Sequence, residues 1–236
     1  MNSVLFAERQ KTSEEYLESV AEEWNGTANG LMESDGVVRG TERFLGHILG
    51  DRRFESRIAA ASSFGMEAAV PLAIIAEQDP HLPVITIDTG HVFPETWDYL
   101  KELKSRLGLT DVRISGLTLD ETRRFSPPKS CCAEVKRAAF FRAFAQFPVW
   151  ISNRKRYHGT SRADLQIVEV KDGKLKINLT AFWSQKQVSA QFKIRNLPYH
   201  PLKAFGYGSL LCQPCTKAAA GRRGRPLECG LHTVRQ

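Results

Sequence analysis

The order of segments between residues 57 and 115 is the feature that most constrains the fold. Three short β-rich runs, at 57–63, 83–88 and 111–115, alternate with helical stretches at 67–77 and 94–107. The middle run is mostly apolar, as expected of a strand buried on both faces of a parallel sheet. This order predicts an α/β fold with a mainly parallel, Rossmann-like sheet, right-handed crossovers and flanking helices.

The regions on either side complete the expected organisation. Thr12 or Ser13 is suited to cap a helix over 14–24, and a break at 25–30 precedes a second helix at 41–49. After the core we expect a helix at 133–146, a strand at 149–152, a hairpin turning at Asp172-Gly173, and a helix at 184–195. The predicted divisions are an N-terminal helical segment at 1–50, an α/β domain at 51–216 and a flexible C-terminal tail at 217–236.

Composition and charge limit the classes of function. No run of eighteen apolar residues occurs and the first residues lack the order of a secretory signal, so we expect a cytoplasmic protein without a membrane partner. The net charge of +7 suits nucleic acid, an acidic surface or a small anion. Three basic clusters flank the cysteines and favour a small anion over nucleic acid: 123–137, 154–162 and 217–225.

Two turns follow consecutive predicted strands and carry groups suited to an anion. Ser62-Ser63-Phe64-Gly65 joins a strand to a helix, where backbone amides and two hydroxyl groups can hold an anion. Asp88-Thr89-Gly90 ends the next strand, at the edge where open α/β sheets place their ligands. Each turn alone is also an ordinary connection, but together they indicate a nucleotide pocket.

The five cysteines all lie in the C-terminal half of the chain. In a reducing compartment this grouping points to metal binding or catalysis rather than disulfides. Cys131-Cys132 and Cys212-x-x-Cys215 make a poor zinc pattern, because structural zinc sites normally use two spaced pairs. Buried thiol packing and a vicinal disulfide remain alternatives for these pairs. The odd count leaves Cys229 over.

The same motifs, with Phe93-Pro94-Glu95-Thr96, resemble those of the sulfonucleotide reductases, which reduce adenylyl sulfate or 3′-phosphoadenylyl sulfate. The resemblance extends from residue 58 to residue 232 and includes the closing Glu-Cys-Gly-Leu-His motif at 228–232. It implies the adenine nucleotide alpha hydrolase-like version of the fold, within the PP-loop superfamily. It also implies that the Ser62 turn cradles the phosphosulfate and that the Asp88 strand end lines the adenosine site.

The resemblance further implies the roles of the cysteines and their neighbours. Cys131, Cys132, Cys212 and Cys215 would bind a [4Fe–4S] cluster. Cys229 would attack the substrate sulfur and form an S-sulfocysteine, from which a thioredoxin-type thiol releases sulfite. Positive charge around the sulfate would come from Lys136, Arg156, Arg162, Arg222 and Arg225, and His232 would be a weak electrostatic partner of Cys229. A homo-oligomer is also expected.

The chain departs from the family pattern in the stretches before Cys212 and before Glu228, and in one loop that bears on the substrate. In the segment 152–162, Asn153, His158 and Gly159 stand where the family has glycine, glutamine and serine. Arg156 and Arg162 are retained. The nucleotide therefore stays open between adenylyl sulfate and 3′-phosphoadenylyl sulfate. An ATP-dependent PP-loop sulfurtransferase and a non-catalytic iron–sulfur paralogue are further alternatives.

Overall fold

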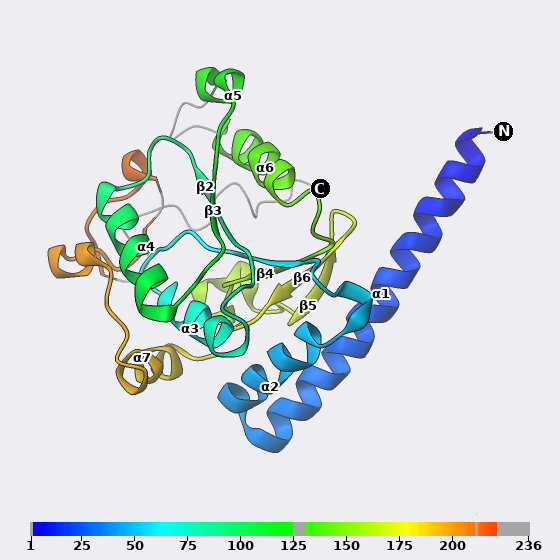
Figure 1. Cartoon of the computed structure of the whole chain (residues 1–236), viewed down its shortest axis with the longest axis horizontal. Helices are drawn as coiled ribbons and strands as arrows, with labels where there is room; N and C mark the ends of the chain where they lie inside the picture. Colours follow the sequence, from blue (N-terminus) through cyan, green and yellow to red (C-terminus); the bar gives the residue numbers. More distant parts are fainter. Residues whose placement is uncertain (1, 125–130, 211, 221–236) are drawn as a thin grey trace. The chain divides into compact units, whose positions relative to one another are not determined.

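The computed structural model describes residues 2–124, 131–210 and 212–220, with the side chains of 2–12 and 131–133 excepted. Six strands form a sheet in the order β3-β2-β1-β4-β6-β5 (Figure 1). The chain falls into two compact units, Met1–Ala59 with Gln146–Gln187, and Ala60–Ala145 with Val188–Gln236. The predicted α/β class with a mainly parallel sheet is confirmed, whereas the divisions at residues 50 and 216 stay predictions.

The first unit contains two N-terminal helices and three strands. The helices α1 and α2 pack against each other, and α1 also contacts the edge strand β5. β4 pairs with β6 in parallel, and β5 and β6 form the predicted hairpin, with Asp172 and Gly173 at positive φ in its turn. The elements are α1 (Asn2–Asp35), α2 (Val37–Leu49), η1 (Arg52–Phe54), β4 (Val149–Ser152), η2 (Arg156–His158), η3 (Thr160–Arg162), β5 (Val168–Lys171) and β6 (Lys174–Asn178).

The predicted break at 25–30 is wrong, because α1 runs through it as one helix. The buried positions Leu17, Val20, Trp24 and Ala28 continue at helical spacing across the two glycines of that stretch. Asn25 also pairs with the backbone of Val168, its Nδ2 donating at 2.9 Å and its Oδ1 accepting at 3.0 Å. The tertiary packing of one face therefore outweighs the low helix propensity of glycine and asparagine.

Close packing of the two helices depends on Gly40 in α2. A side-chain carbon at this position would come within 2.7 Å of the backbone of Leu31 and Met32 in α1. Thr41, the next residue, accepts a hydrogen bond from Trp183 Nε1 at 2.9 Å. The helix pair is thus fixed to the body of its unit by backbone approach and by one buried polar contact.

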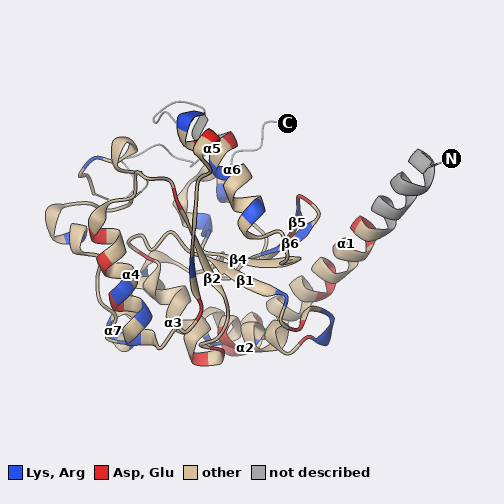
Figure 2. Ribbon diagram, turned by 45° about the horizontal axis from the view of Figure 1, so that its top comes forward, with Lys and Arg blue, Asp and Glu red and all other residues tan. Residues whose placement is uncertain are grey.

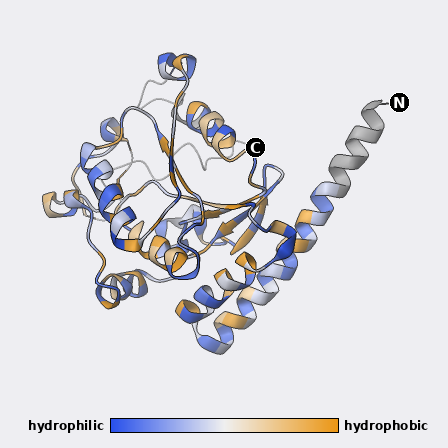
Figure 3. Ribbon diagram, viewed as in Figure 1, coloured by the Kyte–Doolittle hydropathy of each residue, from blue (hydrophilic) through white to orange (hydrophobic). Residues whose placement is uncertain are grey.

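The second unit contains the parallel strands expected from the sequence. β1 pairs with β2 and β2 with β3, all in parallel, and α6 packs on β2 and β3. Its strands and the helix α3 are largely hydrophobic (Figure 3), and Ala69–Ile75 of α3 is buried throughout. Its elements are β1 (Ile58–Ala61, whose first two residues fall in the first unit), α3 (Ala69–Gln78), β2 (Val84–Asp88), α4 (Pro94–Leu107), β3 (Val112–Gly116), α5 (Leu119–Arg124), α6 (Cys131–Ala143), η4 (Pro201–Phe205) and η5 (Gln213–Cys215).

Helix α7 (Gln185–Ile194) begins in the first unit and continues into the second. Among the described helices, none is long and apolar enough to cross a membrane.

A buried carboxylate joins α5 to α6, where acidic and basic residues lie together in Figure 2. Glu121 receives two hydrogen bonds from Arg142, at 2.6 and 2.9 Å, and Arg142 also donates to Gly116 O at 3.1 Å. Thr118 and Glu121 cap each other's backbone amides at 3.2 and 2.7 Å. The guanidinium of Arg142 lowers the pKa of Glu121 to about 2. This contact holds α5 against the last turn of α6.

We expect Glu121→Gln to lower the free energy of unfolding by roughly 1 to 2 kcal/mol at pH 7, because charge-assisted hydrogen bonds are lost. The folded pKa lies below the ordinary value of 4.5. The contribution is therefore complete above that value and is lost as the pH falls from 4.5 towards 2. Denaturant unfolding at pH 7 and at about pH 3 measures the free energy of unfolding of both proteins, and the difference between them should be smaller at the lower pH. Asp120→Asn, at the exposed ion pair with Arg124, is the matched control and should change little.

Candidate functional site

The turn after β1 is a tight connection built around a buried aromatic ring. Phe64 is fully buried and has a φ of 47°, so its burial holds the backbone in the left-handed region. The Ser62 hydroxyl accepts a hydrogen bond from the Phe64 amide at 3.1 Å. At Gly65 a side-chain carbon would lie 3.5 Å from the Ser63 hydroxyl, which is an ordinary contact distance. The turn therefore presents small polar groups at the end of β1.

The turn after β2 lies at the same edge of the sheet, because β1 and β2 are parallel neighbours. Asp88 accepts a hydrogen bond from the Gly90 amide at 2.8 Å, and Gly90 has a φ of 69°. The Asp88 carboxylate thus shapes the turn itself. Thr89 is 4% exposed and points inward. Both predicted turns are therefore formed at one edge, while their role in binding stays a prediction.

Cys212 lies against the second of these turns. Its side chain is 4% exposed, and its Sγ lies 3.4 Å from the Thr89 hydroxyl. Lys136 Nζ donates to the same sulfur at 2.9 Å. Cys215 is half-buried and packs with Cys212 against Val135. The structure therefore brings together Thr89, Lys136 and the second cysteine pair.

The first cysteine pair opens the helix that carries Lys136. α6 begins at Cys131, so the backbone of Cys131 and Cys132 lies about one turn before Val135 and Lys136. Val135 packs against Cys212, and Lys136 donates to its sulfur. Thiolates are soft ligands suited to iron–sulfur clusters, and an ammonium group beside a sulfur offsets their negative charge. The described residues thus fit a cluster site.

Four contacts join the segment after β2 to the segment that leads into Cys212. Thr89 meets Cys212, the Gln213 amide donates to His91 O at 2.8 Å, and Phe93 packs edge-on against Tyr207. The fourth contact joins Thr96 to His200, 104 residues apart in sequence. The position of the second cysteine pair is therefore set by the strand end that was predicted to line the adenosine site.

His200 is a residue that the sequence reasoning missed. It is 1% exposed, its Nδ1 accepts from the Leu202 amide at 3.2 Å, and its Nε2 lies 3.0 Å from Thr96 Oγ1. Since Nδ1 is an acceptor, the ring proton is on Nε2 and points to Thr96. Burial lowers the pKa of His200 to about 4. The signal available in the sequence was only its place between Leu197-Pro198 and Pro201-Leu202.

Arg156 and Arg162 belong to the first unit, and both are engaged within it. Arg156 Nε donates to Leu165 O at 2.9 Å, and its guanidinium lies 4.0 Å from the centre of the Phe182 ring. Arg162 is 6% exposed and lies 3.3 Å from His158 Nδ1. Their predicted contact with substrate stays a prediction.

A buried polar network lies at the ends of β4 and β6 in the same unit. Asn153 Oδ1 accepts from Lys155 Nζ at 2.6 Å and from Thr180 Oγ1 at 2.9 Å, and Lys155 is fully buried. Lys176 pairs with Glu169 at 2.7 Å, and burial lowers the pKa of Lys176 despite this partner. Asn153 replaces the glycine of the family loop, so the departure supplies the acceptor that holds Lys155.

Some predicted site residues lie outside the described part of the chain: Arg222, Arg225, Cys229 and His232. The side chains of Cys131 and Cys132 also lie outside it.

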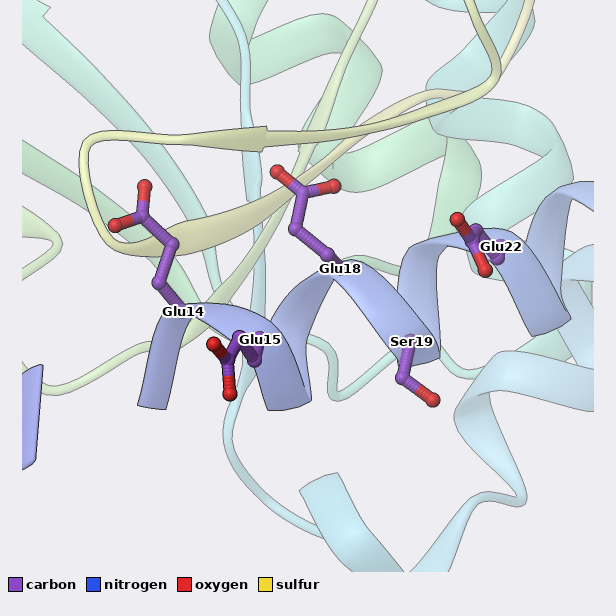
Figure 4. Close-up of a pocket in the computed structure, with 5 residues that line it drawn as sticks. All are labelled: Glu14, Glu15, Glu18, Ser19 and Glu22. Carbon is purple, nitrogen blue, oxygen red and sulfur yellow. The ribbon is translucent and has the colours of Figure 1, made fainter. Parts of the chain in front are cut away.

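A shallow open hollow on α1 is lined by residues of that helix alone: Glu14, Glu15, Glu18, Ser19 and Glu22. In Figure 4, Glu14 and Glu18 extend from one side of the helix, while Glu15 and Ser19 extend from the other. All five are exposed. Among the described residues, no three acidic, histidine or cysteine side chains converge on a metal position. This surface is an exposed face of α1.

Comparison with known proteins agrees with the sequence motifs. The model of the phosphoadenosine phosphosulfate reductase domain matches residues 57–218. The adenosine 5′-phosphosulfate reductase of Mesorhizobium japonicum is 35% identical, over 76% of this chain and 77% of its own length. The phosphoadenosine 5′-phosphosulfate reductase of Alkalilimnicola ehrlichii is 30% identical, over 77% of this chain and 82% of its own length.

Solved structures share the fold. The phosphoadenylyl-sulfate reductase of Candida auris, in a phosphate complex, matches with a TM-score of 0.58 and 20% identity, over 77% of this chain and 92% of that one. The FMN adenylyltransferase of Candida glabrata matches with a TM-score of 0.56 and 15% identity, over 86% and 75% of the two chains. These matches show that the chain shares its α/β fold with both proteins.

The buried His200 predicts a pH-dependent stability. Its folded pKa of about 4 lies below the ordinary 6.5, so protonation disfavours the folded state. The neutral ring's contribution is complete above 6.5 and is lost as the pH falls from 6.5 towards 4. We expect His200→Asn to lower the free energy of unfolding at pH 7. The wild type should lose roughly 2 kcal/mol of this free energy between pH 7 and pH 5 through His200, and the variant should not show that loss.

Thermal or denaturant unfolding across this pH range measures the effect. His81→Asn is the matched control, since His81 is exposed and also bonds a threonine, Thr110, through its ring at 2.9 Å. An unchanged pH slope in the His200 variant would contradict the assignment of a buried neutral ring.

Proposed function

The chain belongs to the phosphoadenosine phosphosulfate reductase family, and on that basis we propose that it reduces adenylyl sulfate to sulfite and AMP in sulfate assimilation. The electrons would come from thioredoxin or a similar thiol reductant. The observation that carries the proposal is the Lys136–Cys212 contact of 2.9 Å beside Thr89. It brings a lysine and a cysteine of the paired set to the strand end suited to a nucleotide.

In this proposal Cys131, Cys132, Cys212 and Cys215 hold a [4Fe–4S] cluster. The support is the chemistry of the donor set: two cysteines pack together at Val135, and α6 brings the backbone of the other pair within about one turn. When bound, the cluster supplies fixed charge and a rigid anchor between α6 and the Cys212 segment. Its predicted role is structural and electrostatic.

The Ser62 and Asp88 turns supply the nucleotide end. The small polar groups of 62–65 suit the phosphosulfate, because backbone amides and hydroxyls at a strand-to-helix turn donate to anions. Thr89 and Gly90 would line the adenosine side. Lys136 is anchored on Cys212 and lies at the junction of these two parts. Its charge would therefore be preorganised near the sulfate rather than recruited from solvent.

The chemistry is covalent transfer to Cys229. The Cys229 thiolate attacks the sulfate sulfur, the bond from sulfur to the bridging phosphate oxygen breaks, and AMP departs with that electron pair. A thioredoxin thiolate then attacks Cys229 Sγ, and sulfite leaves with the electrons of the broken S–S bond. The second thioredoxin cysteine resolves the mixed disulfide and returns Cys229 to its thiol. Lys136, Arg156, Arg162, Arg222 and Arg225 would offset the repulsion between thiolate and sulfate.

The competing substrate is 3′-phosphoadenylyl sulfate, since relatives named for each nucleotide match this chain at similar identity. The paired cysteines favour adenylyl sulfate through the resemblance to iron–sulfur reductases. The altered 152–162 loop bears on the choice, because its Lys155 is fully buried against Asn153. AMP as product supports adenylyl sulfate, and adenosine 3′,5′-bisphosphate supports the alternative.

We expect Cys229→Ser to abolish sulfite release in an assay with both nucleotides and reduced thioredoxin, on anaerobically purified protein. Wild type should release sulfite and accumulate a sulfonated Cys229 adduct when thioredoxin is omitted, visible by intact mass. Cys215→Ser should instead lose the visible iron–sulfur absorption, which separates a ligand from a nucleophile. Sulfite release by Cys229→Ser at the wild-type rate would contradict the mechanism.

Two other outcomes would favour the alternative functions. ATP turnover to AMP without sulfite would favour a sulfurtransferase, and an intact cluster without turnover would favour a non-catalytic paralogue.

We expect Thr89→Val to speed cluster loss in air about tenfold, because a hydroxyl donor at the Cys212 sulfur is removed. The decay of visible absorption measures this. The matched control is Thr86→Val, since Thr86 is also buried and lies three residues earlier, within β2. Equal decay rates for the two variants would show that the Thr89 contact does not support the cluster.

A further inference from the structure

The loop after β4 encloses a positive charge that the proposed chemistry does not use. Lys155 is fully buried, whereas lysine side chains in folded proteins are almost never fully buried unless they are paired. Its Nζ donates to Asn153 Oδ1 at 2.6 Å, and the Thr180 hydroxyl donates to the same oxygen at 2.9 Å. Thr180 is also fully buried. The amide oxygen of Asn153 therefore accepts from two buried donors and holds the ammonium group of Lys155 inside its unit.

The backbone on both sides of Lys155 is tied to the segment that follows β6. The Leu179 amide donates to Ser152 O at 3.2 Å, and the Arg156 amide donates to Ala181 O at 3.0 Å. The three residues between these two bonds therefore span two fixed points. The backbone of Lys155 itself is extended, with φ of −134° and ψ of 145°. Its four-carbon side chain is thus the part of the span with the most rotatable bonds.

The two candidate nucleotides differ in the positive charge that they require. A phosphate group adds about two negative charges at neutral pH and three strong acceptor oxygens. A lysine ammonium is a compact charge on a flexible stem and is a common ligand of phosphate. Lys155 carries such a charge in this loop, but Asn153 binds it. Lys155 can therefore reach a 3′-phosphate only when Asn153 releases it.

The amide of Asn153 determines where the ammonium group is stable. A buried charge is costly unless hydrogen bonds satisfy it. Without the Asn153 oxygen, the Lys155 ammonium loses an acceptor at 2.6 Å and can regain one by turning to water or to a phosphate. The family pattern has glycine at this position, which has no side chain to accept from an amine. The departure at Asn153 is thus an acceptor that favours the buried position of Lys155.

We propose that Asn153 is a specificity-determining residue, which withholds Lys155 from the nucleotide and so favours adenylyl sulfate over 3′-phosphoadenylyl sulfate. The inference rests on the proposed function, because it takes the 152–162 loop to face the substrate. Asn153 acts through Lys155, so it is a positioning residue rather than a catalytic one.

Calorimetric titration of the full chain with AMP and with adenosine 3′,5′-bisphosphate tests the proposal. Wild type should bind AMP more tightly. Asn153→Ala should tighten the binding of the bisphosphate about tenfold, the effect expected of one charge-assisted hydrogen bond, and should leave AMP binding unchanged. In the sulfite assay the same gain should appear in the KM for 3′-phosphoadenylyl sulfate rather than in kcat.

The double variant Asn153→Ala/Lys155→Met should lose the gain, because the released charge is then absent. Lys155→Met alone should leave both affinities unchanged, since the buried ammonium does not meet the nucleotide. Asn153→Asp keeps an oxygen acceptor and should keep the wild-type preference. Thr180→Val is the matched control, because it removes the other donor to the Asn153 oxygen and should not change the preference.

A measurement without nucleotide follows the lysine directly. Brief acetylation and peptide mass mapping should leave Lys155 unmodified in wild type and should modify it in Asn153→Ala, because only the variant exposes the amine. This readout reports the release of Lys155 whether or not the chain turns over a sulfonucleotide.

The outcomes separate this inference from the proposed function. A wild type that binds neither nucleotide would refute the proposed function and the inference with it. An unchanged ratio of the two affinities in Asn153→Ala, or a Lys155 that stays unmodified in that variant, would overturn the inference alone. A loss of affinity in Lys155→Met for either nucleotide would also overturn it, since Lys155 would then already contact the nucleotide in the wild type.

Discussion

The sulfur of Cys212 is the point on which the arrangement of the second unit depends. The Thr89 hydroxyl, at the end of β2, and Lys136, on α6, both reach it. Its own segment is held by Gln213 on His91 and by His200 on Thr96. The strand end, the helix and the loop are far apart in sequence, and all three meet at this one buried side chain. A change at any of the three should be felt at the other two.

Much of this could be predicted because it is local. The parallel strands follow from apolar runs and turn residues, and the hairpin follows from Asp172-Gly173, whose residues both adopt positive φ. The continuation of α1 through 25–30 could not be predicted in the same way. Local propensity favours a break at two glycines. The helix continues because Ala28 is buried and because the Asn25 side chain bonds a strand more than a hundred residues away in sequence.

The candidate site divides along the same line. The sequence predicts Thr89 and Lys136 as residues near a nucleotide, which stays a prediction, and only the folded chain shows that both contact one cysteine. His200 carries no motif of its own, and its importance comes from burial and from a partner on another helix. Spacing along the chain identifies residues that share a turn or a helix face. It does not identify a pair that meets only after the sheet has formed.

The same reasoning explains why the cysteine chemistry is easier to read than the nucleotide preference. A cysteine set is defined by residue type and spacing, and both are visible in the sequence. Discrimination between two nucleotides that differ by one phosphate depends on which cations remain available to it. In the 152–162 loop, Lys155 is buried and bonded to Asn153, while Arg156 stacks on Phe182. Under the proposed function, Asn153 thus holds a neighbouring positive charge that this loop would otherwise offer to a second phosphate.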